Sequence, residues 1–309
     1  MMKLTNMLRG LQDDRPARKL MTRWEHDEGS LRYWRASSNF VYAFACEGRS
    51  RFLRFIHASD HSKPQIEAEL DYVRYLAANG YPVAAPVMSA DGQWIETIED
   101  DTGGNYYGVA FEEAEGVHVP LDRMTDAHCA SWGRSLARLH ELSARYVPDA
   151  DSPVRWSWRD VLDWTRGVLE RHPEEEAALL ECDRVQAWLE TLPQDGRLAG
   201  LIHFDFQPDN VFDRGGEAGF SAIDFDDAMM HWYAAARRWA TSRISRRPSQ
   251  SGSCAPSSPA TSRFGRSMRT RNRRLRSFGA STDFTLSRES CAAWRGWTNR
   301  PPRNGCPSC

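Results

Sequence analysis

The sequence predicts an α+β protein with a small antiparallel-sheet N-terminal lobe and a mainly helical C-terminal lobe. Short runs rich in aromatic and β-branched residues dominate residues 31–98, and such runs are typical of strands. After Val119 the apolar residues follow helical spacing, and short strand-like runs return between Leu201 and Phe225. We expect three segments: an N-terminal lobe that includes an N-terminal helix, a C-terminal lobe, and an Arg/Ser-rich tail, at residues 1–113, 114–234 and 235–309.

The N-terminal lobe is expected to be a sheet interrupted by one helix. Its strands are predicted at Tyr33–Ala36, Phe40–Ala45, Arg51–Ile56 and Tyr106–Phe111. Apolar residues at steps of four, three and three indicate an amphipathic helix between Ile66 and Leu76. Pro64 near its start and Gly80 just past its end agree with the usual boundaries of a helix.

The C-terminal lobe is expected to combine helices with a small cluster of strands. Apolar residues at steps of three and four predict one helix through Cys129 and Leu139 and a second through Ala178 and Leu189. Short strands are predicted at Leu201–Phe204, Asn210–Asp213 and Gly219–Phe225.

Composition excludes several classes of protein. With 309 residues, 41% of them hydrophobic, the chain can bury a core without a disulfide framework. No apolar run reaches the roughly 18–20 residues of a membrane span, and residues 1–15 lack the hydrophobic segment of a secretory signal. Seven cysteines without framework spacing fit a reducing compartment. We therefore expect a cytoplasmic protein with no membrane partner.

The charge of the chain changes abruptly near residue 235. Residues 235–309 contain sixteen arginines, no lysine and two acidic residues, whereas the preceding residues contain 40 acidic and 24 basic side chains. A genuine basic tail would bind nucleic acid or acidic lipid. We favour a shift of reading frame near codon 235, because a segment of this composition cannot bury a core. Nucleic acid is an expected partner only if the tail is genuine.

The residues that can carry chemistry gather in two clusters, 201–212 and 222–227. Both clusters place acidic residues directly after an apolar strand, which suggests groups held at strand ends in a cleft. Asp205, Asn210 and Asp224 supply hard oxygen ligands and one further carboxylate. Mg²⁺ prefers one or two carboxylates together with substrate phosphates. Phosphoryl transfer also needs an aspartate carboxylate that orients and deprotonates the attacking hydroxyl. The clusters therefore predict a site for phosphoryl transfer with Mg²⁺.

The motif His203-x-Asp205-x4-Asn210, followed by Ile-Asp224-Phe-Asp226, resembles the catalytic signature of the aminoglycoside phosphotransferase and choline kinase group, relatives of the protein kinases. The resemblance covers about two thirds of the chain and implies a two-lobed, protein-kinase-like fold. It implies that Asp205 is the catalytic base and that Asn210 and Asp224 bind Mg²⁺. His203 is implied to brace the catalytic loop, and Asp226 is expected to give structural support.

The resemblance also implies nucleotide-binding residues in the N-terminal lobe. Ser37, Ser38 and Asn39 lie where the family has its nucleotide-covering loop. This loop has no glycine, but backbone N–H groups can still cradle phosphate. Arg54 stands where the family usually has lysine, so that the charge is kept while the geometry differs. Glu69 matches the acid that pairs with this cation.

Phe111 and Glu113 fall where the interlobe hinge of the family meets adenine. The resemblance implies transfer of the γ-phosphoryl group of ATP, with Mg²⁺, to a hydroxyl of a small molecule such as an aminoglycoside or an amino alcohol. The excess of acidic over basic residues before residue 235 favours a cationic acceptor. Two alternatives stay open. One is a nucleotide-binding regulator without kinase activity, whose basic tail binds nucleic acid. The other is a metal-dependent phosphohydrolase built on His203, Asp205, Asp224 and Asp226.

Overall fold

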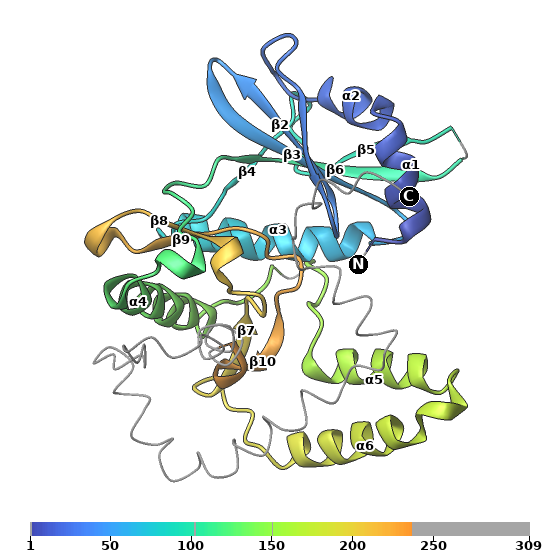
Figure 1. The fold of residues 1–309 in the computed structure, drawn as a ribbon, viewed down its shortest axis with the longest axis vertical. Coiled ribbons are helices and arrows are strands. Elements are labelled where there is room, and N and C mark those ends of the chain that lie inside the picture. The colour runs from blue at the N-terminus through green and yellow to red at the C-terminus, as the bar shows by residue number, and fades with distance from the viewer. Residues whose placement is uncertain (1, 102, 150, 237–309) are drawn as a thin grey trace, which may run out of the picture. The chain divides into compact units, whose positions relative to one another are not determined.

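The computed structural model describes residues 2–101, 103–149 and 151–236 (Figure 1). The Arg/Ser-rich tail thus lies almost wholly outside the described residues, and neither interpretation of it is tested. The described chain divides into two compact units: residues 2–157 with 194–236, and residues 158–193. Nowhere in the described part does a helix combine the length and the apolar character that crossing a bilayer requires.

The first unit contains a six-stranded antiparallel sheet. Its strands are β1 (Arg32–Ala36), β2 (Phe40–Cys46), β3 (Arg49–His57), β4 (Pro86–Val87), β5 (Glu96–Glu99) and β6 (Asn105–Glu112). β3 lies between β2 and β6, with Leu53 opposite Tyr42 on one side and Ala110 on the other. The four strands predicted in this lobe are confirmed. β4 and β5 are too short to give a strand pattern in the sequence.

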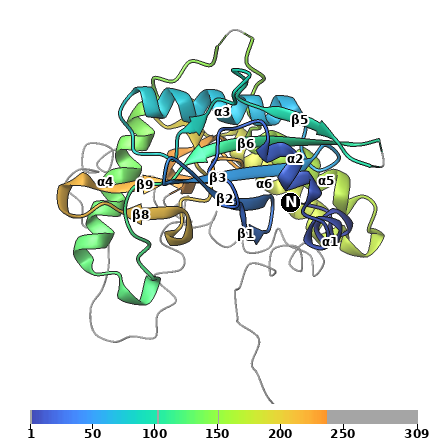
Figure 2. The ribbon, with the colours of Figure 1, turned by 90° about the horizontal axis from the view of Figure 1, so that it is seen from above.

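Helices cover both faces of this sheet. α1 (Leu4–Gln12) precedes α2 (Arg15–Met21), and Leu20 of α2 packs in one core cluster with Leu53. On the opposite face, Ile66 of α3 (Lys63–Ala78) packs with Ile56, and Figure 2 shows α3 running alongside the sheet. Because successive side chains of a strand point to opposite faces, Arg54 of β3 lies on the same face as Ile56, toward α3.

The boundaries of α3 agree with the sequence signals. Ser62 and Gln65 form a capping box at its start, and Pro64 occupies the first turn, where its missing N–H costs no helical hydrogen bond. Gly80 follows the last turn with φ at +68°, a conformation that glycine adopts without steric cost.

The remainder of the first unit is built from one long helix and two small strand pairs. They are α4 (Asp126–Ser143), β7 (Ala199–Ile202) paired with β10 (Met229–Trp232), and β8 (Val211–Asp213) paired with β9 (Phe220–Ala222). Single 3-10 turns lie at Leu121–Arg123, Pro208–Asn210 and Gly216–Ala218. The strand predicted at Gly219–Phe225 ends at Ala222, because Asp224 has a left-handed backbone with φ at +67° that a strand cannot accommodate.

The second unit is a pair of packed helices, α5 (Trp158–Leu169) and α6 (Glu176–Glu190), joined through a 3-10 turn at Pro173–Glu175. α6 contains the predicted helix through Ala178 and Leu189. α5 is not among the predicted helices, although its buried residues Trp158, Leu162 and Leu169 follow helical spacing. Its Trp164 side chain is exposed.

Candidate active site

Two loops carry the predicted catalytic and metal-binding residues. The loop after β7 contains His203, Asp205 and Asn210, and the loop after β9 contains Asp224. The two loops are joined by hydrogen bonds on either side of Ile223: its N–H donates to the Asn210 carbonyl (3.0 Å), and His203 Nε2 donates to its carbonyl (2.8 Å). The structure therefore brings together residues that lie about twenty positions apart in the chain.

Asn210 holds the Asp205 carboxylate. Its Nδ2 donates to Asp205 Oδ2 (2.9 Å) and to the Asp205 carbonyl (3.1 Å), and the Gln207 side chain also bonds to this carboxylate. Asn210 is buried, and its Oδ1 accepts no hydrogen bond. A buried oxygen without a donor is costly unless a positive group faces it.

This amide oxygen fits a metal ligand. Asn210 Oδ1 and the Asp224 carboxylate are hard oxygen donors of the kind that Mg²⁺ prefers, and they belong to loops that are directly hydrogen-bonded to each other. Within the described residues, no three His, Cys, Asp or Glu side chains are grouped closely enough to hold a metal between them.

His203 is a fully buried, neutral histidine. Burial lowers the pKa of its ring to about 4, and the carbonyl that it bonds requires the proton to be on Nε2. Its Nδ1 has no partner, and its ring centroid lies 4.3 Å from that of Phe225. The ring thus links the two loops through one hydrogen bond and one aromatic contact.

Asp224 lies between two guanidinium groups. Arg35 Nη2 is 3.3 Å from its Oδ2, and Arg54 Nη1 is 3.9 Å from its Oδ1. Burial and the neighbouring Asp226 nevertheless raise the pKa of Asp224 well above its ordinary value, against the opposite effect of the two arginines. Like Asp224, Phe204 has a positive φ, +62°. Such backbones are rare outside glycine and cluster at functional sites.

Arg54 and Glu69 form a two-pronged ion pair. The guanidinium donates to both carboxylate oxygens, at 2.8 and 2.6 Å, and the Glu69 side chain is only 3% exposed. Burial by itself would lower the pKa of Arg54, but the Glu69 carboxylate raises it above the ordinary value. The Phe111 ring faces the guanidinium, with 4.9 Å from its centroid to Arg54 Cζ.

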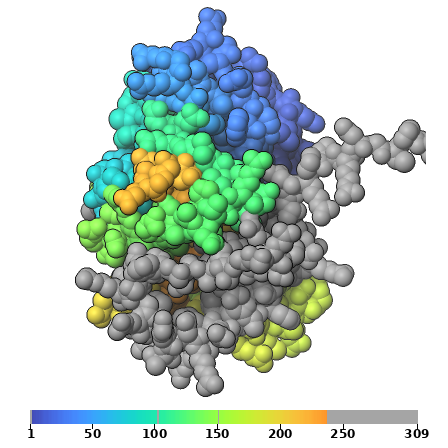
Figure 3. Space-filling view, turned by 60° about the vertical axis from the view of Figure 1, so that its left-hand side comes forward, coloured from blue at the N-terminus to red at the C-terminus, as the bar shows by residue number. Residues whose placement is uncertain are grey.

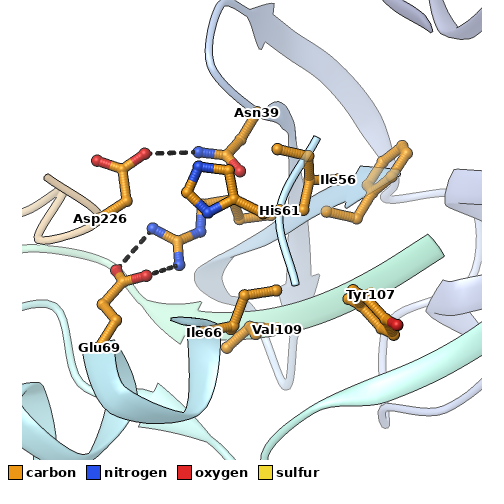
Figure 4. Close-up of a pocket in the computed structure, with 10 residues that line it drawn as sticks. Asn39, Ile56, His61, Ile66, Glu69, Tyr107, Val109 and Asp226 are labelled. Carbon is orange, nitrogen blue, oxygen red and sulfur yellow. Dashed lines mark hydrogen bonds and ion pairs between the residues drawn. The ribbon is translucent and has the colours of Figure 1, made fainter. Parts of the chain in front are cut away.

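The turn between β1 and β2 is tied to the loop after β9. Ser37 N–H donates to the Asn39 carbonyl (3.1 Å), and Asn39 Nδ2 donates to Asp226 Oδ2 (3.0 Å). Figure 4 shows Asn39 and Asp226 pointing toward each other across a small pocket that His61 also lines. Burial would raise the pKa of Asp226, but the nearby positive charges, Arg54 first among them, lower it below its ordinary value. Ser38 lies in the same turn.

The segment after β6, which contains Glu113, is anchored to the β8–β9 hairpin. Val117 and Asp213 exchange two backbone hydrogen bonds, of 2.9 and 2.8 Å. Gly116 has φ at +109°, and a Cβ there would lie 2.6 Å from the Asp213 carbonyl oxygen, so that only glycine fits. In Figure 3 the hairpin, in orange, reaches the surface directly beside this green segment.

Two arginines of the site are not predicted by the sequence motifs. Arg155 donates to the carbonyls of Phe225 (3.0 Å), Asp226 (2.6 Å) and Ala228 (2.8 Å) and so clamps the loop after β9. It lies in an irregular stretch without sequence pattern. Arg35, which pairs with Asp224, could have been noticed because it lies two residues before the predicted nucleotide-covering loop.

A model of the Phosphotransferase enzyme family matches residues 32–235 of the chain. The chain belongs to this family. The resemblance drawn from the motif is thereby confirmed. The match ends at the point where the charge pattern of the sequence changes.

Curated members of the family are similar to this chain over part of their length. Amicoumacin kinase of Bacillus subtilis (strain 168) is 25% identical over 215 residues, which cover 68% of this chain and 62% of the relative. Homoserine kinase of Hyphomonas neptunium is 33% identical over 158 residues, which cover 49% of this chain and 44% of the relative. The chain therefore spans less than two thirds of the length of these relatives.

Solved structures show the same fold. An amicoumacin kinase structure with AMP-PNP, Ca²⁺ and Ami has a TM-score of 0.71 at 23% identity, covering 80% of this chain and 75% of the other. A microcompartment-associated aminopropanol kinase has a TM-score of 0.61 at 24% identity, covering 94% and 82%. The α+β, protein-kinase-like fold, with an antiparallel sheet in the N-terminal lobe and a mainly helical C-terminal lobe, is confirmed.

Proposed function

We propose that this protein is an ATP-dependent phosphotransferase that moves the γ-phosphoryl group to a hydroxyl of a small molecule. One observation carries the proposal: the Asn210 amide holds the Asp205 carboxylate through its nitrogen and presents a buried, unpartnered oxygen in the same site. Phosphoryl transfer needs this pair of functions, a carboxylate for the acceptor and an oxygen ligand for a metal.

In this proposal Asp205 is the catalytic base. Its carboxylate accepts the proton of the acceptor hydroxyl and aligns the hydroxyl oxygen with the phosphorus. Asn210 Oδ1 and Asp224 hold Mg²⁺, which when bound neutralises charge on the phosphates. Arg54, fixed by Glu69, binds the α- and β-phosphates.

The other predicted residues have supporting roles. The turn at residues 37–39 covers the phosphates, and the segment from Phe111 to Glu113 meets the adenine. His203 and Asp226 position the two loops through the hydrogen bonds to Ile223 and from Asn39. The lobes are proposed to span residues 1–113 and 114–234.

We further propose an amino alcohol as the acceptor. The names of the similar proteins, homoserine kinase and aminopropanol kinase, support a small acceptor that carries both a hydroxyl and an amine. The excess of acidic residues before residue 235 favours such a cationic group. A cytoplasmic location stays a prediction.

The test is an acceptor panel assayed with the full chain and MgATP. Homoserine, 1-amino-2-propanol, choline and aminoglycosides are incubated separately, and ADP and the phosphorylated acceptor are measured by mass spectrometry. ADP formation that depends on one acceptor, with its phosphate ester as product, is the expected result. Nucleotide binding without any turnover would favour the regulator, and phosphate release from a monoester without ATP would favour the phosphohydrolase.

A further inference from the structure

A second arginine competes for the carboxylate that is proposed to hold the metal. Arg35 and Arg54 each approach one oxygen of Asp224, at 3.3 and 3.9 Å. A divalent cation on Asp224 would need one of these oxygens and would repel both guanidinium groups at this range. A metal on Asp224 therefore favours the movement of at least one guanidinium group away from this carboxylate.

The surroundings of the two arginines decide which one moves. The Arg54 side chain is 12% exposed and is held by two hydrogen bonds to the buried carboxylate of Glu69. Releasing it would leave the Glu69 charge buried and uncompensated, which is costly. The Arg35 side chain is 40% exposed, so that it can turn away from Asp224 at little cost.

The position of Arg35 also indicates where its guanidinium would go. It is in β1, two residues before Ser37, and the turn that follows is fixed by the bond from Ser37 N–H to the Asn39 carbonyl and by the bond from Asn39 to Asp226. A polyphosphate lying between this turn and Asp224 would be within reach of the side chain. A guanidinium pairs with two phosphate oxygens at once.

We propose that Arg35 exchanges partners during nucleotide binding. It neutralises Asp224 in the empty site, and it binds the terminal phosphates of a nucleoside triphosphate once a divalent metal occupies Asp224. This inference rests on the proposed nucleotide site and assigns to it a second phosphate-binding cation beside Arg54.

The exchange of partners predicts that one substitution at Arg35 weakens the binding of a nucleoside triphosphate and strengthens the binding of a metal ion alone. Arg35→Met removes a ligand of the triphosphate and should weaken binding of AMP-PNP with Mg²⁺ by about tenfold or more, as for the loss of a charge-assisted hydrogen bond. AMP, which lacks the terminal phosphates, should bind as to the wild type. Mn²⁺ alone should bind more tightly, because its competitor for Asp224 is gone. A variant that was merely misfolded would lose affinity for all three.

The experiment measures these affinities on the full chain, by calorimetry for the nucleotides and by electron paramagnetic resonance for Mn²⁺. Arg32→Met is the matched control, because Arg32 is an exposed arginine of the same strand, and it should change none of them. Arg35→Lys should recover part of the AMP-PNP affinity.

Two results would overturn the inference: equal AMP-PNP affinity in Arg35→Met and the wild type, or weaker Mn²⁺ binding by the variant. If the wild type binds AMP-PNP but Arg35→Met binds it equally well, the proposed function stands and only the partner exchange fails. A wild-type chain that binds no AMP-PNP would overturn both.

Discussion

Arg54 is predicted to stand where the family usually has lysine, and its guanidinium makes contacts that an ammonium group could not reproduce. Two of its nitrogens bond to the two oxygens of Glu69, and a third contact reaches Asp224. A lysine offers a single charged point and cannot reproduce this fork. The departure from the family pattern is thus matched by local geometry.

Because Glu69 is buried, we expect Arg54→Met to be strongly destabilising. The variant leaves an uncompensated carboxylate in the core, and the free energy of unfolding should fall by about 3–5 kcal/mol. Urea denaturation measures this loss. The double variant Arg54→Met/Glu69→Leu, which removes both charges, should recover most of the stability; a double variant no more stable than the single one would show that the charge of Glu69 is not the cause.

At the scale of elements, the loop after β9 depends on a residue far away in the chain. Arg155 donates to three of its carbonyls and to that of Gln65 (3.3 Å). We expect Arg155→Met to lower the free energy of unfolding by at least about 2 kcal/mol, because backbone carbonyls lose their donors. Chemical denaturation tests this.

The matched control for this substitution is Arg145→Met. Arg145 is an exposed arginine that donates to a single carbonyl one helical turn away, and its removal should change stability by no more than about 0.5 kcal/mol. Equal effects of the two substitutions would refute the clamping of the loop by Arg155.

Some of the secondary-structure elements can be predicted from the sequence, and others cannot. Strand pattern, capping residues and the spacing of apolar positions predict β1 to β3, α3, α4 and α6, because these signals are local. The end of β9 depends on the left-handed backbone of Asp224, which residue type does not reveal. β10 acquires its strand geometry by pairing with β7, about thirty residues earlier in the chain.

The residues of the candidate site also fall into those that local sequence signals reveal and those that they do not. Asp205, Asn210 and Asp224 could be found because they follow apolar strands at a characteristic spacing. Arg155 could not be assigned, because its partners lie 70 or more residues away, and the only local signal for Arg35 is its place just before the predicted nucleotide-covering loop. A contact of this range has no local pattern.

At the scale of the whole molecule, three histidines whose ring nitrogens are shielded from solvent link stability to pH. Burial lowers the pKa of His140 to about 3 and that of His203 and His231 to about 4. The unfolded chain takes up these protons near pH 6.5, whereas the folded chain does so only below about 4. Between these values the unfolded state binds more protons, so that stability falls as the pH is lowered, by up to about 1.4 kcal/mol per pH unit for each histidine.

These histidines lower the free energy of unfolding from pH 7 to pH 5, against the opposite contribution of Asp227, whose pKa burial raises to about 7. We expect His140→Phe to be more stable at pH 5, relative to its stability at pH 7, than the wild type is. Phenylalanine keeps an aromatic ring against Tyr233, whose ring centroid lies 4.6 Å from that of His140, but it cannot take up a proton. Urea denaturation at several pH values measures the slope. The exposed His26 supplies the control, since His26→Gln removes no buried ring; an unchanged slope in His140→Phe would contradict the prediction.

The central claim, that Asp205 is the base of an ATP-dependent phosphotransferase, is tested most directly by Asp205→Asn beside Asp209→Asn. Asp209 is an exposed acid of the same loop, so that the pair separates the role of one carboxylate from that of local charge. With the acceptor identified by the panel, Asp205→Asn should bind AMP-PNP as the wild type does and transfer phosphate about 10²–10⁴-fold more slowly, while Asp209→Asn keeps most of its activity. Full turnover by Asp205→Asn would contradict the assignment.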